Sequence, residues 1–270
     1  ILHKVKIISL APADFRSVLY AIQFSRPDEI YYLAGQTSVG LSFEQPFEAF
    51  ESIAIGTLNF LESIRILGIN CRFFNAGSTE CFGNSPDEII TEDSPMRPVS
   101  PYAVAKATSY WITDNYRKSY DMFACTGLLS NHESPLRPAR FVTSKIVAGI
   151  HEIKNGDRDY LELGNLSISR DWGWAWDFAR AIHLVTTAPV ANNYIIATGQ
   201  THSLMEFIQA LCSISRLDPN TIIRTNSNLF RPSELTTISL SPAKILRDLS
   251  WKSKVNFSLL VEKLYRDELF

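Results

Sequence analysis

The sequence predicts a doubly wound α/β fold, in which a parallel sheet carries helices on both faces. Three observations predict it. Short apolar runs alternate with stretches of helical periodicity over the first two-thirds of the chain. Glycine and proline bound several of these runs, and no internal repeat interrupts them. The 270 residues, of which 46% are hydrophobic and 20% charged, can bury one large core or two coupled cores.

The beginning of the chain is predicted to hold two strands and two helices. Residues 4–10 form the first predicted strand, and residues 14–24 a helix that Asp14 caps. The next strand covers residues 28–33, between Pro27 and Gly35. Apolar residues from 47 to 67 then recur at a spacing of about 3.6 residues, and Gly68 ends this predicted helix.

The alternation continues with a strand at 71–76, a helix at 101–119 and a strand at 122–129. After residue 130 the pattern loosens. We expect helices at 141–155, 174–187, 203–215 and 257–269, with strands at 160–163 and 193–197. The proline-rich bend at 135–138 is the predicted crossing into a smaller α/β lobe.

Bulk properties exclude several classes of protein. A net charge of −2 gives no electrostatic case for a nucleic-acid partner. No apolar run approaches the roughly 18 residues of a membrane span, so we expect no membrane partner. The four cysteines lack a C-x-x-C pair, which fits reduced thiols in a cytoplasmic protein. The five histidines lack ligand-like spacing, so no metal site is expected.

The segment Ser100-Pro101-Tyr102-Ala103-Val104-Ala105-Lys106 is the most informative in the chain. Ser100 suits an N-cap and Pro101 the first helical position, which places Tyr102 and Lys106 one turn apart on one face. A nearby cation and the positive end of a helix both favour the phenolate, so Tyr102 can move a proton on and off an alcohol. The simpler interpretation is a half-buried tyrosine and a solvated lysine on an ordinary helix.

A polar cluster follows the apolar run at residues 71–75. Ser78 and Glu80 come where the predicted strand ends, and the carboxyl ends of strands are where doubly wound sheets bind ligands. If the extended conformation persists through Glu80, both side chains point to the same side. A serine hydroxyl can then orient a substrate oxygen, while the carboxylate removes a carbon-bound proton. The alternative is a strand that simply turns into a polar loop.

Together, these four residues resemble the Ser/Thr–Tyr–Lys core of the extended short-chain dehydrogenase/reductases, and Glu80 narrows the resemblance to nucleotide-sugar 4,6-dehydratases. Further segments, which follow in order from about residue 27 to 252, resemble the GDP-mannose 4,6-dehydratase family. They are Ser42-Phe43-Glu44, Asn131-His132-Glu133-Ser134-Pro135, Phe141-Val142-Thr143, Arg170-Asp171-Trp172-Gly173, Ile196-Ala197-Thr198-Gly199 and Arg231-Pro232-Ser233-Glu234.

The resemblance implies an NADP-dependent hydro-lyase that converts GDP-mannose to GDP-4-keto-6-deoxymannose, a step of GDP-fucose biosynthesis. It implies a Rossmann-like sheet over residues 1–135, to which 174–200 return, and a nucleotide-sugar-binding lobe over 136–173 and 201–270. By the same resemblance Tyr102 is the acid/base at C4, Lys106 supports it and holds the nicotinamide ribose, Ser78 orients the C4 oxygen, and Glu80 is the base at C5.

The family's ligand contacts also map onto this chain. The resemblance assigns NADP to Leu33, Ala34, Gly35, Gln36, Thr37, Tyr102, Lys106, His132 and Arg137. It assigns GDP-mannose to Asn131, Lys145, Arg170, Arg231 and Glu234. Relatives assemble as homodimers or homotetramers, which is the assembly expected here.

The beginning of the sequence departs from the family. No glycine precedes Gly35, so the glycine-rich turn that cradles a dinucleotide pyrophosphate is not in this sequence. By resemblance residue 1 falls just before the third strand, and about 60 residues are expected to precede it in a complete Rossmann domain. Two alternatives therefore stay open, a non-catalytic nucleotide-sugar-binding homologue or fragment, and a sibling nucleotide-sugar epimerase or reductase.

Overall fold

The structure is a computed structural model that describes residues 4–233 and 235–269. The chain forms two compact units. The first unit comprises residues 1–81, 100–128 and 184–193, and the second comprises 82–99, 129–183 and 194–270. Within the described residues, no helix combines the length and hydropathy needed to cross a membrane.

The first unit is built on strands β1 (Glu29–Tyr32), β2 (Arg72–Ser78) and β3 (Ala124–Leu129). β1 pairs in parallel with β2, Glu29 lying opposite Arg72, and β2 lies between β1 and β3. β3 is buried along its whole length, as a central strand covered on both faces must be. The parallel pairing and the strand–helix–strand order confirm the predicted α/β class.

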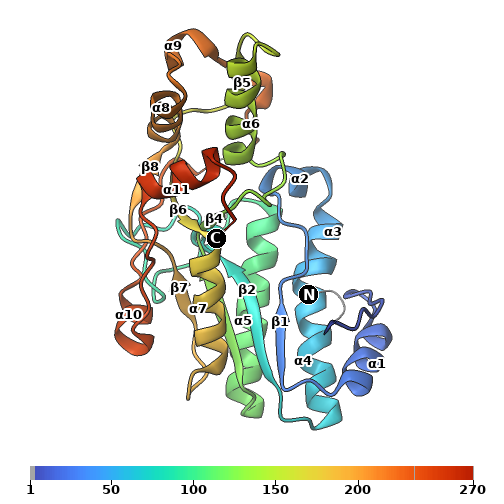
Figure 1. The fold of residues 1–270 in the computed structure, drawn as a ribbon. Helices are drawn as coiled ribbons and strands as arrows, with labels where there is room; N and C mark the ends of the chain where they lie inside the picture. The colour runs from blue at the N-terminus through green and yellow to red at the C-terminus, as the bar shows by residue number, and fades with distance from the viewer. Residues whose placement is uncertain (1–3, 234, 270) are drawn as a thin grey trace. The chain divides into compact units, whose positions relative to one another are not determined.

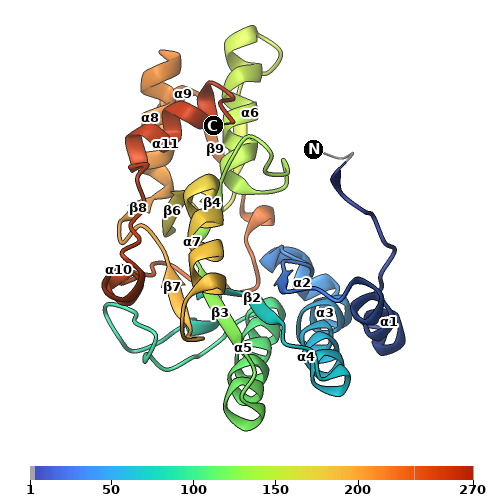
Figure 2. The ribbon, with the colours of Figure 1, turned by 60° about the horizontal axis from the view of Figure 1, so that its bottom comes forward.

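Among the described residues, five α-helices belong wholly to this unit, and Figures 1 and 2 both show α4 beside α5. They are α1 (Phe15–Ser25), α2 (Val39–Glu44), α3 (Pro46–Phe50), α4 (Gly56–Leu67) and α5 (Pro101–Tyr120). Two predicted helix ends are confirmed. Asp14 accepts a hydrogen bond from the backbone N of Arg16, and Gly68 closes α4 with a φ of 59°.

The strand predicted at residues 4–10 is wrong. These residues belong to no strand, and Val5 and Ile7 are 53% and 82% exposed. An apolar run becomes a strand only where a neighbouring backbone pairs with it, and the described residues place none beside this segment.

The helix predicted over 47–67 is broken into three parts, because a π-helical segment, Glu51–Ile55, separates α3 from α4. The cause is a side chain. The Tyr32 hydroxyl donates to the Ser52 carbonyl at 2.5 Å, and the Gly56 N–H bonds instead to Glu51 and Ile53. A group that takes a carbonyl out of the helical ladder produces this kind of local widening.

The described residues of the second unit include a three-stranded sheet, a two-stranded sheet, strand β7 and most of the later helices. β4 (Asn131–Glu133) pairs in parallel with β6 (Ser169–Trp174), which pairs antiparallel with β8 (Thr201–Ser203). β5 (Leu161–Leu163) pairs in parallel with β9 (Ile223–Thr225). At β7 (Tyr194–Ile196), the carbonyl of Ile196 accepts from the Ser130 backbone N.

The helices of the second unit surround one apolar core. α6 (Val142–Asn155) and α11 (Phe257–Tyr265) both pack on α8 (Leu204–Ser215), as Figure 1 shows. Ile150, Trp172, Phe207 and Leu260 lie in this core, each at most 2% exposed. The remaining helices are α7 (Ala175–Thr187), α9 (Pro219–Ile222) and α10 (Ala243–Leu249). α11 ends at Tyr265, so the predicted helix to residue 269 is too long.

The two units agree in number with the two predicted lobes. Their boundaries differ, because residues 82–99 and 129–135 group with the second unit. The assignment of a cofactor-binding and a nucleotide-sugar-binding role to these lobes stays a prediction.

Candidate active site

Tyr102 is held at the first turn of α5, as the sequence predicts. Ser100 caps the helix, its hydroxyl accepting from Ala103 N at 3.1 Å, and Pro101 occupies the first turn. The Tyr102 N–H donates to the hydroxyl of Ser42, on α2, at 3.1 Å. Tyr102 as a whole is half-buried.

Lys106 lies one turn further and is 7% exposed, which rules out the simpler interpretation of a solvated lysine. Its Nζ donates to the Ala76 carbonyl on β2 at 2.6 Å and lies 5.6 Å from the centroid of the Tyr102 ring. Burial lowers the pKa of Lys106 to about 8. The side chain therefore carries its charge at pH 7, enclosed between the strand and the tyrosine.

Ser78 and Glu80 do not share one extended strand, so that part of the sequence prediction is wrong. β2 ends at Ser78, and Thr79–Phe82 form a 3₁₀ turn. The Ser78 hydroxyl accepts from the backbone N of Glu80 at 3.3 Å, which favours the turn over an extended chain. Ser78 is 7% exposed and Glu80 is half-buried. Both follow Ala76, the acceptor of Lys106, so they lie at the strand end where Lys106 is bound.

The segment Leu33–Thr37 follows β1 at its carboxyl end. Leu33, Ala34 and Thr37 are exposed, and Gly35 has a φ of 123°, which only glycine adopts easily. Gln36 is buried, and its amide pairs with the backbone of Ser38 through two hydrogen bonds of 2.7 and 2.8 Å. The segment is thus a rigid, accessible turn.

Asn131, His132 and Arg137 lie in the second unit. The His132 ring nitrogen Nδ1 is 2.9 Å from the Ser130 carbonyl and so carries the proton there. Arg137 is held by the carboxylate of Glu133 at 2.9 Å, and its guanidinium stacks 3.9 Å above the Phe141 ring. Burial raises the pKa of Glu133, and Arg137 and Thr143 oppose that rise.

The predicted GDP-mannose residues also lie in the second unit, in contrasting settings. Arg170 is 5% exposed and donates to the carbonyls of Ser169 and Thr236. Lys145, in the first turn of α6, donates to the Glu162 carbonyl at 2.7 Å. Arg231 is exposed. Glu234 lies outside the described residues.

Asp171 has no role in the sequence analysis beyond its place in a family segment. It is 1% exposed and accepts hydrogen bonds from the Ser130 hydroxyl and from the backbone N–H groups of Thr198, Gly199 and Gln200. Burial raises the pKa of Asp171. β6 carries only two apolar side chains, Trp172 and Trp174, so no local pattern in the sequence signals this role of Asp171.

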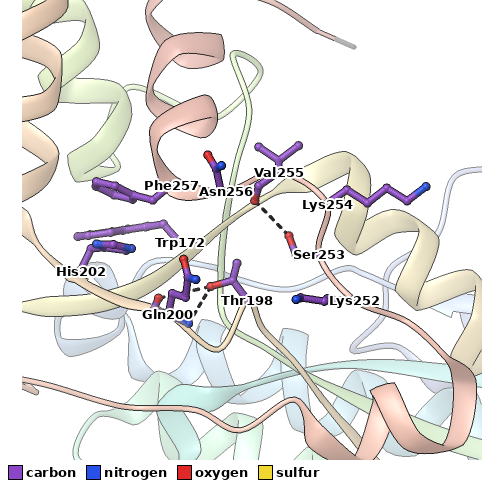
Figure 3. A pocket seen from close by; sticks show the side chains of 10 residues that line it. All are labelled: Trp172, Thr198, Gln200, His202, Lys252, Ser253, Lys254, Val255, Asn256 and Phe257. Atoms are coloured by element: carbon purple, nitrogen blue, oxygen red, sulfur yellow. Dashed lines mark hydrogen bonds between the residues drawn. The ribbon is translucent and has the colours of Figure 1, made fainter.

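A cavity of about 210 Å³ lies in the second unit, and Figure 3 shows the side chains around it. The rings of His202 and Phe257 stack with centroids 3.8 Å apart beside Trp172. The other lining residues are Thr198, Gln200 and residues 252–256. None of the described site residues predicted from sequence lines this cavity.

Comparisons with known proteins point to one family. The family model described as GDP-mannose 4,6 dehydratase matches residues 2–264. GDP-mannose 4,6 dehydratase of Drosophila melanogaster is 36% identical over 277 residues, covering 95% of this chain and 70% of the relative. GDP-mannose 4,6 dehydratase 2 of Arabidopsis thaliana is 37% identical over 260 residues, with 95% and 69% covered.

Solved structures with the same fold include RMD from Pseudomonas aeruginosa complexed with NADPH. That chain has a TM-score of 0.86 and 22% identity, with 96% of this chain and 87% of that one covered. The Thermus thermophilus UDP-glucose 4-epimerase complex with NAD has a TM-score of 0.81 and 25% identity, with 96% and 84% covered. At 22% identity, the similarity to RMD is evidence for a shared fold only.

Proposed function

Since the chain belongs to the GDP-mannose 4,6-dehydratase family, we propose that it converts GDP-mannose to GDP-4-keto-6-deoxymannose, with NADP as its bound cofactor. The net reaction is loss of water from the hexose. The hydroxyl leaves C6, C4 becomes a ketone, and C6 becomes a methyl group.

One observation carries the proposal. The buried Lys106 ammonium bonds to Ala76 on β2 at 2.6 Å and lies 5.6 Å from the Tyr102 ring centroid. The strand that holds Lys106 continues into Ser78 and then into the turn that carries Glu80. A cation, a phenol, a hydroxyl and a carboxylate therefore belong to one strand end and the helix beside it, which supports their joint use on one sugar.

Tyr102 accepts the proton of the C4 hydroxyl as that carbon is oxidised. A phenol is a weak base at neutral pH, and a fixed cation beside it stabilises the phenolate. Lys106 supplies that cation. NADP, which Lys106 would hold, would supply the hydride acceptor and donor of the reaction and would be regenerated in each cycle. Ser78 donates a hydrogen bond to the C4 oxygen and keeps it close to the phenol.

Glu80 acts in the second half of the reaction. The C4 ketone makes the hydrogen on C5 acidic, and the Glu80 carboxylate removes this proton and passes it to the departing C6 hydroxyl, which leaves as water. The proton that Tyr102 took from the C4 hydroxyl then replaces the one lost from C5, so the net change is the loss of one water. Epimerases and reductases need no base at C5, so a carboxylate two residues after Ser78 favours the dehydratase over these siblings.

The residues present fit the nicotinamide-ribose end of the cofactor. An ammonium has three donors, of which the Ala76 bond uses one, so Lys106 can bind the ribose hydroxyls through the others. The accessible turn Leu33–Thr37 and the proton-bearing His132 are proposed as further contacts. Arg137 is proposed to reach NADP as well, although its guanidinium is already oriented by Glu133 and Phe141.

The nucleotide diphosphate is assigned to residues of the second unit. α6 begins at Val142, and its N-cap residue Phe141 makes no side-chain cap, which leaves helical N–H groups suited to an anion. Lys145 and Arg140 add positive charge to this part of the chain. Arg231 is proposed to bind the same phosphates, and Asn131 the sugar-phosphate end. Arg170 is proposed as a phosphate contact whose position the Ser169 and Thr236 carbonyls fix.

Replacing Glu80 by Gln tests the proposal. With NADP and GDP-mannose supplied, we expect formation of the 4-keto-6-deoxy product to fall by at least about a hundredfold. GDP-mannose should bind as in the wild type, and NADPH absorbance should accumulate because C4 oxidation still proceeds. Glu88→Gln removes an exposed carboxylate and is the matched control, expected to change the rate by less than about twofold. Undiminished elimination by Glu80→Gln contradicts the assignment of the base.

We further propose a cytoplasmic enzyme in the route to GDP-fucose that assembles as a homodimer or homotetramer. All four cysteines are free and buried, which agrees with a reducing compartment. Light scattering tests the assembly, and a product that a GDP-4-keto-6-deoxymannose reductase consumes tests the route.

A further inference from the structure

The backbone N–H of Tyr102 finds its acceptor outside its own helix. Tyr102 N donates to Ser42 Oγ at 3.1 Å, although the two residues are 60 positions apart in sequence. The neighbouring groups are satisfied locally. Pro101 has no N–H, and Ala103 N donates to Ser100 Oγ at 3.1 Å. Ser42 therefore completes the capping of α5 at the residue that carries the phenol.

The Ser42 hydroxyl is itself fixed. Ser42 is 0% exposed, and its Oγ donates to the Val39 carbonyl at 2.7 Å. Because the hydroxyl hydrogen is committed to Val39, the oxygen presents lone pairs to Tyr102. The Ser42 backbone N bonds to the Ser38 carbonyl at 3.1 Å, so the residue cannot move without disturbing α2.

α2 also connects to the turn that follows β1. Ser38 caps α2 by accepting from Leu41 N at 3.2 Å, and the Gln36 amide holds the Ser38 backbone on both sides. Hydrogen bonds thus run from Gln36 through Ser38 and Ser42 to Tyr102. The turn proposed to contact the cofactor and the proposed acid/base share one rigid connection.

We propose that Ser42 is a positioning residue, which holds the first turn of α5 so that the Tyr102 phenol stays aligned with the substrate hydroxyl. The role in turnover rests on the proposed function. Ser42 is fully buried and acts through the Tyr102 backbone. Catalysis depends steeply on such alignment, since a displacement of about 1 Å can lower a rate about a hundredfold.

Two variants and two readouts test this. Ser42→Ala removes the acceptor, and Ser42→Cys replaces it with a weak one of similar size. We expect kcat to fall roughly ten- to a hundredfold in Ser42→Ala while KM changes by less than about twofold, with Ser42→Cys in between. Amide hydrogen exchange at Tyr102, followed by NMR of protein labelled with ¹⁵N-tyrosine, should accelerate at least about tenfold in Ser42→Ala and less in Ser42→Cys.

Thr57→Val is the matched control. Thr57 is also 0% exposed in the first unit, but its hydroxyl bonds only to the Ile53 carbonyl of its own helical run. It should change neither kcat nor Tyr102 exchange. A Ser42→Ala kcat within about twofold of wild type, wild-type exchange at Tyr102, or the same effects in Thr57→Val would each overturn the proposal.

The exchange readout does not depend on turnover. A wild-type protein that binds NADP and GDP-mannose without product formation overturns the proposed function alone, and exchange then still decides whether Ser42 holds Tyr102. Where Ser42→Ala does not fold, the near-isosteric Ser42→Cys carries the same comparison.

Discussion

The Lys106 ammonium is almost fully enclosed in the first unit, with 7% of the residue exposed. Enclosing a charge is costly, and one hydrogen bond to the Ala76 carbonyl offsets only part of the cost. That imbalance is why burial lowers the pKa of Lys106 to about 8. Burial also has a functional advantage, because water would screen the attraction between the Lys106 charge and the Tyr102 phenolate.

The free-energy cost of burying the Lys106 charge predicts that the stability of the folded protein depends on pH. Below about pH 8, Lys106 is protonated in both the folded and the unfolded chain. Between about pH 8 and 10.5, the protonated fraction of Lys106 is larger in the unfolded chain. Raising the pH through this window therefore favours the folded state. We expect the unfolding free energy of wild type, relative to Lys106→Met, to rise by up to about 3 kcal/mol between pH 7 and 10.5. Denaturant titrations of both proteins check this, and a flat difference contradicts it.

At the scale of elements, the sequence predicted correctly those helix ends that are determined by residues close by in the chain. The Ser100-Pro101 start of α5, the Asp14 cap of α1 and the Gly68 end of α4 all follow from side chains close in sequence. What failed depends on distant partners. The strand expected at 4–10 lacks a pairing neighbour, and the Tyr32 hydroxyl widens the helix at Ser52 from 20 residues away.

The candidate site also has features that local sequence predicts and features that depend on distant residues. Tyr102 and Lys106 could be placed on one face because helical spacing fixes them. The turn at Glu80 could not be foreseen, because a 3₁₀ segment and an extended strand suit those residues equally well. The Ser42–Tyr102 bond joins residues 60 positions apart, and no local pattern marks it.

The close approach of β2 and β3 behind the site predicts a sensitive glycine. A Cβ on Gly77 would lie 2.6 Å from Thr126 Cγ2 and 3.0 Å from the Gly127 carbonyl oxygen. Gly77→Ala should therefore lower the unfolding free energy by about 1–3 kcal/mol and shift the strand end that carries Ser78. Urea denaturation measures the first effect.

Gly40 provides the control for this prediction. A Cβ there would meet only Ser38 Oγ, at 3.9 Å, and Gly40 lies inside α2. Gly40→Ala should leave stability unchanged or raise it by up to about 1 kcal/mol, because alanine suits a helix better. Equal destabilisation by both substitutions would show that the strand contact is not the cause.

At the scale of the molecule, the second unit depends on Asp171, whose carboxylate binds four donors from two segments. In Asp171→Asn one oxygen becomes an NH₂ group that faces backbone N–H groups. We expect a loss of about 1–3 kcal/mol. Four of the five tryptophans, Trp172, Trp174, Trp176 and Trp251, lie in this unit, so tryptophan fluorescence follows its unfolding. Asp218→Asn should be neutral, since asparagine caps α9 equally well.

The two units carry different parts of the proposed chemistry, which predicts that the two ligands protect different segments of the chain. The proposed base and cation, Tyr102 and Lys106, lie in the first unit, while Lys145, Arg170 and Arg231 lie in the second. A ligand at 100 times its Kd stabilises the state that binds it by about 2.7 kcal/mol. Hydrogen exchange should therefore slow over residues 33–44, 100–106 and 132–137 with NADPH, and over 141–147 and 168–172 with GDP. Protection by GDP without any by NADPH favours the non-catalytic nucleotide-sugar-binding homologue, because the dehydratase chemistry assigned to Tyr102 requires the cofactor beside it.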